Sequence, residues 1–299
     1  MSLDSRITEH RNPRTADVDL ASAGTIVDLM NAEDRTVADA VASERDHIAA
    51  AIGLVEQAFR SGGRLFYVGA GTSGRLGILD ASECPPTFGS DPELVQGIIA
   101  GGPPAVFRSQ EGAEDVPEHG AAAIDERGVG RDDVVAGIAA SGTTPFVRGA
   151  LTRAMQAGAK TIVIACTPLP ADVTELVDVA IVAVTGPEVL TGSTRLKAGT
   201  ATKMILNMLT TGAMIRVGKT WGNLMVDLQA TNLKLRDRSE RILVETCGVS
   251  REEARGLLES AGGSVKRAIV MHRLSIDGAE ADRRIASAGG VIRRVVGDP

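Results

Sequence analysis

Five short apolar segments, separated by stretches with helical spacing, are the feature that most constrains the fold of this 299-residue chain. The segments are Arg64–Val68, Leu94–Ile99, Asp133–Ala139, Thr161–Ala165 and Val179–Val184. They are continuous apolar runs, not alternating ones, which is typical of strands that helices cover on both faces. Alternating strands and helices imply right-handed crossovers between parallel strands. We therefore predict an α/β protein with a doubly wound, mostly parallel five-stranded sheet flanked by helices.

Helices are predicted before, between and after these strands. The spacing is helical from about Leu20 to Phe59, where apolar residues recur every three or four positions. The polar residues 1–20, which include Pro13, are predicted to form an extended arm. The remaining helices are expected at Arg75–Ala81, Ala105–Arg127, Phe146–Ala157, Leu196–Val217, Met225–Leu235 and Ser239–Cys247.

The C-terminal tail, from about Val249, is predicted to form a separate small module. Two glycine-containing breaks, at residues 262–263 and 277–278, divide it into three short helical segments. Ser250 followed three residues later by Glu253 predicts a capping box, and Ser264 is placed to cap the next helix. We therefore expect two domains: residues 1–248 around the sheet, with the N-terminal arm, and residues 249–299 as a three-helix module.

Composition excludes several classes of function. A net charge of −6 and an aromatic content of only 2% disfavour nucleic-acid binding. The three cysteines and four histidines are scattered, so neither a disulfide framework nor a metal site is predicted, and no cofactor is expected. There is no run of about 18 or more apolar residues and no N-terminal signal segment, so we expect no membrane insertion. The cysteine usage favours a reducing compartment, and we predict a cytoplasmic protein.

A glycine-rich loop, Gly69–Gly74, follows the first predicted strand and has the spacing GxGxxG. A dinucleotide-binding loop also requires an acidic residue after the second strand, but Asp91 and Glu93 precede that strand. A Walker A loop would require lysine and a hydroxyl residue where this chain has Arg75 and Leu76. Both nucleotide interpretations are therefore weakened.

An anion site at the start of a helix is the simpler interpretation of this loop. Glycines allow backbone N–H groups to converge, and the helix N-terminus adds partial positive charge. Thr72 and Ser73 add hydroxyl donors at the same place. The alternative is a tight strand–helix turn that binds nothing, because glycine turns are common.

A second loop, Ala140–Pro145, has the same setting after another strand and before another helix, and it carries Ser141, Thr143 and Thr144. Loops at the carboxyl ends of strands are where open parallel sheets bind ligands. Two hydroxyl-rich loops without a phosphate-binding lysine suit a phosphate monoester on a sugar better than a triphosphate. We therefore predict a sugar phosphate as the ligand.

A third segment, Gly186–Lys203, leads into a long predicted helix and concentrates hydroxyl, acidic and basic side chains. Taken alone, it would be interpreted as a capped helix with solvated charges. Its density of polar groups, beside the two other loops, supports a wall of the same site. The candidate ligand-binding residues of this wall are Glu188, Ser193 and Lys197.

The three segments together resemble the sugar isomerase (SIS) domain and, more narrowly, the N-acetylmuramic acid 6-phosphate etherase family. The resemblance covers nearly the whole chain and includes Thr8–Pro13 and the run Gly69–Gly89. The Gly186–Lys203 segment is shared with glucokinase regulatory proteins, so it does not separate an enzyme from a regulator. The long Gly69–Gly89 run and the single SIS unit favour the etherases.

The resemblance implies a homodimeric lyase of peptidoglycan recycling that releases D-lactate from N-acetylmuramate 6-phosphate. By resemblance, Glu83 is the acid toward the lactate oxygen and Glu114 is the base at C2. An acid at neutral pH requires desolvation, which the apolar, proline-lined segment after Glu83 is expected to supply. Composition alone does not choose between Glu114 and its neighbours Glu111 and Asp115, which are predicted within one helical turn. A sugar-phosphate-binding regulator and an aldose–ketose isomerase stay as alternatives.

Overall fold

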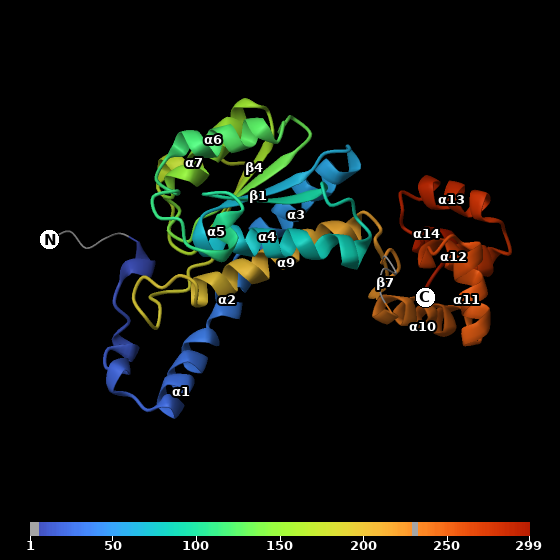
Figure 1. Ribbon diagram of the computed structural model, residues 1–299, viewed down its shortest axis with the longest axis horizontal. Helices are drawn as coiled ribbons and strands as arrows, with labels where there is room; N and C mark the ends of the chain where they lie inside the picture. Colours follow the sequence, from blue (N-terminus) through green and yellow to red (C-terminus); the bar gives the residue numbers. More distant parts are fainter. Residues whose placement is uncertain (1–5, 229–232) are drawn as a thin grey trace. The chain divides into compact units, whose positions relative to one another are not determined.

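The computed structural model describes residues 6–228 and 233–299 and divides into two compact units (Figure 1). The first, called the sheet unit, comprises the chain up to Ala81 together with Glu93–Thr210. The second, called the helical unit, comprises Ser82–Pro92 and Thr211–Pro299. The helical unit thus begins upstream of the boundary after residue 248 that the sequence pattern suggested.

The sheet unit contains five parallel strands in the order β2-β1-β3-β4-β5. All five predicted strands are confirmed, with ends that differ from the prediction by no more than two residues. The strands are β1 Leu65–Gly69, β2 Val95–Ile99, β3 Val134–Ile138, β4 Lys160–Ala165 and β5 Val179–Val182. The predicted α/β class with a doubly wound parallel sheet is therefore confirmed.

Helices cover both faces of the sheet, which explains why the strands are apolar throughout (Figure 1). On one face, Phe66, Val135 and Val163 form a buried cluster with Leu151 of helix α7 and Ile124 of helix α6. On the other face, the hydroxyl of Tyr67 reaches helices α4 and α9. The helices that contribute to this unit are α3 Arg45–Arg60, α4 Gly71–Phe88, α5 Pro104–Phe107, α6 Pro117–Glu126, α7 Pro145–Gln156, α8 Ala171–Thr174 and α9 Lys197–Arg216, of which α4 and α9 continue into the residues of the helical unit.

The strand order places a topological switch between β1 and β3. Helix α4 leads from β1 to β2 on one side, and helix α7 leads from β3 to β4 on the other. Gly69, the last residue of β1, is in register with Ile138, the last residue of β3. Ligands of open α/β sheets bind in the crevice that opens at such a point. Both hydroxyl-rich loops start there.

Two predicted helices of the sheet unit have different boundaries. Helix α4 extends seven residues beyond the predicted end at Ala81, to Phe88, and includes Pro85 and Pro86. The single helix predicted at Ala105–Arg127 is instead divided into α5 and α6 by a loop at residues 108–116. Gly112 in this loop has a φ of +73°, and Pro117 starts α6, a position that proline favours.

The N-terminal residues 6–20 are not the extended arm that was predicted; residues 1–5 lie outside the described part. They form three short 3₁₀ turns, at Ile7–Glu9, Pro13–Thr15 and Val18–Leu20. Asn12 caps the second turn by accepting from the N–H of Arg14. Thr8 and Thr15 are buried, so this segment packs onto the sheet unit. Helices α1 Ala23–Asp34 and α2 Val37–Ala42 then lead to α3.

The helical unit contains a short hairpin where a helix was predicted from Met225. Met225 lies in β7 and pairs with Thr220 of β6, and residues 229–232 of the predicted helix lie outside the described part. The capping box of Ser250 with Glu253 and the cap from Ser264 are confirmed. The elements are β6 Thr220–Trp221, β7 Leu224–Met225, α10 Leu233–Cys247, α11 Arg251–Ser260, α12 Val265–Leu274, α13 Gly278–Ser287 and α14 Arg293–Val296.

The contact between α6 and α7 depends on glycine, because a Cβ added at Gly149 would lie 1.9 Å from the carbonyl oxygen of Pro117. We expect Gly149→Ala to lower stability by about 1–3 kcal/mol through overpacking. The matched control is Gly53→Ala in α3, where an added Cβ meets nothing within 4 Å. That change should raise stability by about 0.5–1 kcal/mol through helix propensity. Thermal unfolding followed by circular dichroism measures both; equal melting temperatures for the two variants would contradict the packing argument.

Candidate active site

The loop after β1 brings the start of helix α4 unusually close to the sheet. A Cβ at Gly69 would lie 2.7 Å from the N atom of Gly74, and a Cβ at Gly74 would lie 2.6 Å from Cγ1 of Ile99. The glycine spacing is thus explained by close helix–strand approach. Thr72 and Ser73 are partly buried in the first turn of α4, where helix N–H groups lack intrahelical acceptors. This turn presents N–H groups, two hydroxyls and a partial positive charge to an anion.

The loop after β3 presents a second group of hydroxyls. Ser141 Oγ lies 3.2 Å from Thr143 Oγ1, across Gly142, whose φ is +70°. Thr144 occupies the N-cap position of α7, but its hydroxyl makes no capping hydrogen bond. Ser141, Thr143 and Thr144 are all partly exposed. Their hydroxyls are therefore available beside the first turn of α7.

Glu114 is held next to this second loop through its backbone. The N–H of Phe146, in the first turn of α7, donates to the carbonyl oxygen of Glu114 at 3.0 Å. The Glu114 side chain is exposed and lies in a turn rather than in the helix that was predicted. Glu111 and Asp115 also lie in this non-helical loop. The loop geometry, not a helix, therefore positions the carboxylates.

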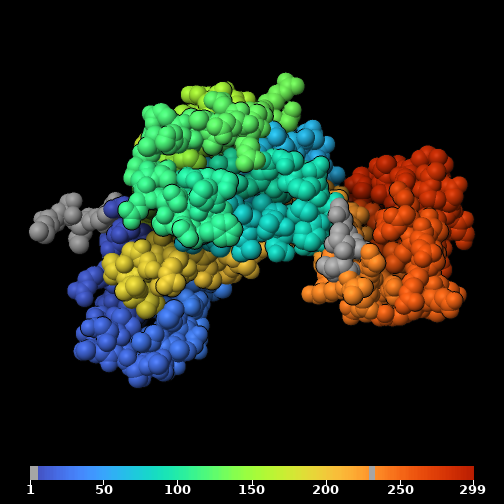
Figure 2. Space-filling view, viewed as in Figure 1, coloured from blue at the N-terminus to red at the C-terminus, as the bar shows by residue number. Residues whose placement is uncertain are grey.

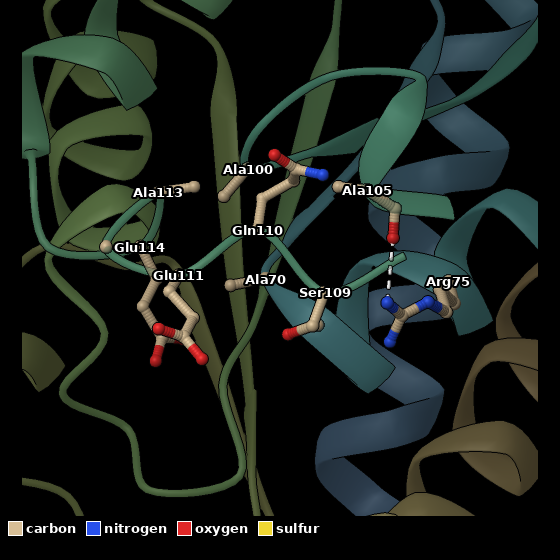
Figure 3. A pocket seen from close by; sticks show the side chains of 11 residues that line it. Ala70, Arg75, Ala100, Ala105, Ser109, Gln110, Glu111, Ala113 and Glu114 are labelled. Atoms are coloured by element: carbon tan, nitrogen blue, oxygen red, sulfur yellow. Dashed lines mark hydrogen bonds between the residues drawn. The ribbon is translucent and has the colours of Figure 1, made fainter. Parts of the chain in front are cut away.

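A cavity of about 240 Å³ opens between the ends of β1 and β2 and the loop of residues 108–116 (Figure 3). Glu111 and Glu114 both line it, whereas Asp115 does not. Figure 3 shows the two carboxylates on one side and the Arg75 guanidinium on the other. The full lining is Ala70, Gly71, Arg75, Ala100, Ala105, Ser109, Gln110, Glu111, Gly112, Ala113 and Glu114. The cavity thus joins the glycine-rich loop after β1 to the predicted base.

The third segment differs from the prediction in how its charged residues are used. Glu188 is 0% exposed, and its carboxylate accepts from the N–H groups of Lys197 and Ala198, both at 2.9 Å. It therefore caps α9 with a negative charge, a favourable place for an anion. Burial raises the pKa of Glu188, and the two N–H donors oppose that shift. Glu188 has no acceptor exposed to a ligand, so we interpret it as a support of the site and not as a ligand contact.

Lys197 is also 0% exposed and is paired inside the protein. Its Nζ atom lies 2.6 Å from Oε2 of Glu33, a residue of α1. Arg14 completes the cluster by donating to both carboxylate oxygens of Glu33. Hydrogen bonding from Arg14, helped by Lys197 and opposed by burial, lowers the pKa of Glu33 to about 2. The predicted contact of Lys197 with phosphate is therefore not what this structure shows.

The N-terminal segment holds the third segment from outside (Figure 2, dark blue against yellow). Thr15 Oγ1 donates to the carbonyl of Val189 at 2.8 Å, and the Asn12 side chain donates to that of Pro187 at 3.3 Å. Ser193, the remaining candidate of this segment, is partly exposed. Glu33 was not identified from the sequence, because it carries a common polar side chain in a stretch without a motif. Asn12 lies in the run Thr8–Pro13 that carries the family resemblance, but no role was predicted for it.

The third segment also adjoins the first loop. A Cβ at Gly199, in the first turn of α9, would lie 3.7 Å from Cγ2 of Thr72. The starts of α4 and α9 are therefore in contact, and the start of α7 follows the neighbouring strand β3. The three segments predicted to form one site do lie together at one edge of the sheet.

Glu83 lies in the second half of α4 and is exposed. The desolvation expected from its proline-lined surroundings is thus not provided, because Pro85 and Pro86 continue the helix instead of folding over the carboxylate. Cys84 beside it is buried. The structure leaves the side chain of Glu83 open to solvent.

Within residues 6–228 and 233–299, no three His, Cys, Asp or Glu side chains are grouped so that they could hold a metal ion. The same residues contain no helix with the length and apolar character needed to cross a membrane.

The fold and the hydroxyl-rich loops define a protein of the sugar-phosphate-binding SIS class. In agreement, residues 47–155 match the family described as the glucokinase regulatory protein N-terminal SIS domain. Relatives named N-acetylmuramic acid 6-phosphate etherase match almost the whole chain. The protein from Mycolicibacterium smegmatis is 54% identical over 99% of this chain and 99% of its own. Those from Trichormus variabilis and Mesorhizobium japonicum are 53% and 50% identical, over 97% and 99% of this chain and 94% and 96% of theirs. The chain belongs to the N-acetylmuramic acid 6-phosphate etherase family.

The buried pair of Glu33 and Lys197 predicts a large effect of Glu33→Gln on stability. This change leaves a buried ammonium group without its carboxylate, which should cost about 3–5 kcal/mol at pH 7. The lowered pKa of Glu33 adds a pH dependence: its stabilisation is complete above its ordinary value of 4.5 and declines as the pH falls toward about 2. The difference between wild type and Glu33→Gln should therefore shrink between pH 5 and about pH 2. Urea denaturation across this range measures it.

Asp46→Asn is the matched control for Glu33→Gln. Asp46 pairs with Arg45 at the surface, where its side chain is 86% exposed. Removing one carboxylate there should cost less than about 1 kcal/mol. Equal losses in the two variants, or a difference for Glu33→Gln that does not change with pH, would contradict the role assigned to the buried pair.

Proposed function

We propose that this protein is a carbon–oxygen lyase that cleaves the D-lactyl ether of N-acetylmuramic acid 6-phosphate. The products are N-acetylglucosamine 6-phosphate and D-lactate, which places the enzyme in amino sugar catabolism and peptidoglycan recycling. The observation that carries the proposal is the 54% identity to an etherase over 99% of both chains. The cavity that joins an anion-binding helix start to a carboxylate supports it.

The substrate phosphate is proposed to bind where the starts of α4 and α7 present their donors. Thr72 and Ser73 supply hydroxyls beside the free N–H groups of α4. Ser141, Thr143 and Thr144 supply the second group of hydroxyls, and Ser193 is a further candidate. These neutral donors suit a phosphate monoester, whose charge the helix starts help to stabilise. Glu188 and Lys197 support the site by fixing the start of α9.

The reaction is proposed to proceed through the open-chain aldehyde, which makes the proton at C2 acidic. Glu114 removes that proton, and the electron pair forms the C2–C3 double bond as the C3–O bond breaks. Glu83 protonates the departing lactate oxygen. Water then adds at C3 and a proton returns to C2, which restores the saturated sugar. Glu114 lines the cavity as a base should, and Glu83 is assigned by family resemblance.

A regulator without activity is the second candidate, and one observation favours it. Residues 47–155 match the SIS domain of a glucokinase regulatory protein. An aldose–ketose isomerase is the third, because it would need the same acidic C2 proton. The full-length match to relatives named etherases supports the lyase over both.

One assay separates the three candidates. Incubation with N-acetylmuramate 6-phosphate should release D-lactate, which D-lactate dehydrogenase detects. Tight binding of the substrate without lactate release would instead identify a regulator. Conversion of hexose phosphates to ketoses without lactate release would identify an isomerase.

A hydrogen-exchange experiment should distinguish the proposed roles of Glu83 and Glu114. Glu83→Gln should abolish lactate release but keep exchange of the C2 hydrogen with solvent, because the base is intact. Glu114→Gln should lower the rates of lactate release and of C2 hydrogen exchange by about 10²- to 10⁴-fold, the range expected for a general base. NMR in deuterium oxide measures the exchange.

Asp115→Asn is the matched control for the exchange experiment, because Asp115 is exposed and does not line the cavity. It should keep both activities within a few-fold of wild type. If Glu111→Gln and not Glu114→Gln abolished exchange, the base would be Glu111. If exchange vanished in Glu83→Gln while ether cleavage survived, the acid and base roles would be reversed.

We further propose that the enzyme is a cytoplasmic homodimer. Three large apolar side chains of the sheet unit are strongly exposed: Leu20 at 85%, Val27 at 57% and Leu190 at 60%. These side chains are available to an interface between copies, and the family resemblance is the basis for proposing one. Sedimentation equilibrium should give twice the mass of the chain, and a monomer at micromolar concentration would contradict the dimer. The cysteine usage supports a reducing compartment.

A further inference from the structure

We propose that Arg75 binds the carboxylate of the lactyl group and thereby makes the site specific for the lactyl ether. This inference rests on the proposed function and deepens it. It starts from a cation that lines the cavity and that neither the phosphate loops nor the acid–base pair employs. The substrate carries two anions, a phosphate at C6 and a lactyl carboxylate at C3, and the donors of the loops after β1 and β3 account only for the phosphate.

The Arg75 side chain is held in a fixed orientation by backbone oxygens. Its Nε atom donates to the carbonyl of Val106 at 2.9 Å. Its Nη2 atom donates to the carbonyl of Ala105 at 2.8 Å (Figure 3). Both carbonyls belong to the short helix α5. A guanidinium group has five N–H donors in one plane, so these two bonds leave three, on Nη1 and Nη2. The remaining donors form the outer edge of the fork, which suits a carboxylate.

Arg75 also has a charge that the chain does not neutralise directly. Within the part of the chain that the structure describes, its hydrogen bonds go to the two neutral carbonyls, and no carboxylate forms an ion pair with it. The side chain is partly buried, so the missing counter-charge is more costly than it would be in open solvent. A partly buried guanidinium with free donors on a cavity wall is suited to bind an anion.

The position of Arg75 favours the lactyl carboxylate over the phosphate. Arg75 shares its cavity with Glu114, the proposed base at C2. C3, which carries the lactyl ether, is bonded to C2, whereas the phosphate on C6 is four carbons from C2 along the open chain. Arg75 faces Glu114 across this cavity, so a substrate whose C2 lies at Glu114 can direct its C3 substituent toward Arg75. The same charge would stabilise lactate as it departs, because electrostatic stabilisation of a leaving group lowers the barrier.

The test compares two ligands that differ in the lactyl group. N-acetylmuramate 6-phosphate has it, and N-acetylglucosamine 6-phosphate lacks it but keeps the phosphate. The affinities of both are measured by titration calorimetry with wild type, Arg75→Lys and Arg75→Gln, in a Glu83→Gln background that prevents turnover of the first ligand. D-lactate release in the native background gives KM and kcat.

We expect Arg75→Gln to weaken the binding of N-acetylmuramate 6-phosphate by about 10- to 100-fold, which is the effect expected for the loss of hydrogen bonds to a charged group. Arg75→Lys should be intermediate, because it keeps the charge and loses the fork. The affinity for N-acetylglucosamine 6-phosphate should stay within about twofold in both. Arg108→Gln is the matched control: it removes an exposed arginine of the same loop region that does not line the cavity, and it should change neither affinity.

An equal loss of affinity for both ligands would overturn the proposal and identify Arg75 as a phosphate ligand. An unchanged affinity for both ligands would also overturn it, and Arg75 would then serve only to hold α4 and α5 together. Arg75→Gln removes the hydrogen bonds between α4 and α5 and could unfold the protein. If it does, the affinities of the two ligands are compared between wild type and Arg75→Lys. If wild type released no D-lactate, the proposed function would fail, yet the ratio of the two affinities would still decide whether Arg75 recognises the lactyl carboxylate.

Discussion

The buried ion pair between Glu33 and Lys197 is the interaction on which the third wall of the site depends. A carboxylate and an ammonium group inside a protein are each costly to desolvate, and their attraction compensates only when the remaining donors are satisfied. Here Arg14 supplies the second partner of Glu33, and the N–H of Lys197 is bound by Glu188. The pair therefore requires three chain segments to be in place at once: the N-terminal turns, α1 and the start of α9.

Burial separates the polar residues of the site into two groups with different tasks. Glu33, Glu188 and Lys197 are almost completely buried and fully engaged with one another or with backbone groups. The hydroxyls of the two loops and the carboxylate of Glu114 remain accessible. The first group gives the start of α9 a fixed position, and the second offers donors and a base to a ligand. The same residue types therefore either fix the structure of the site, when they are buried, or are available to a ligand, when they are exposed.

Much of this arrangement could be predicted from the sequence, because local patterns determine it. Continuous apolar runs identified every strand of the parallel sheet, and the loops after β1 and β3 were expected to converge because parallel strands end at one edge. Three features could not be found this way. The break between α5 and α6 depends on Gly112 and Pro117 within a stretch of otherwise helical spacing. The pairing of Glu33 with Lys197 joins residues 164 positions apart, and no local pattern reports such a contact. The exposure of Glu83 depends on how α4 continues through two prolines.

The N-terminal turns have a consequence for the order in which the protein can fold during synthesis. Asn12 and Thr15 bind carbonyls 175 and 174 residues further along the chain. The acceptors of these two bonds do not exist until the ribosome has made nearly two thirds of the protein. Closing so long a loop carries a large entropic penalty before any contact compensates it, so these bonds form late. The first segment to be synthesised is thus among the last to dock, and until then the site that it supports is incomplete.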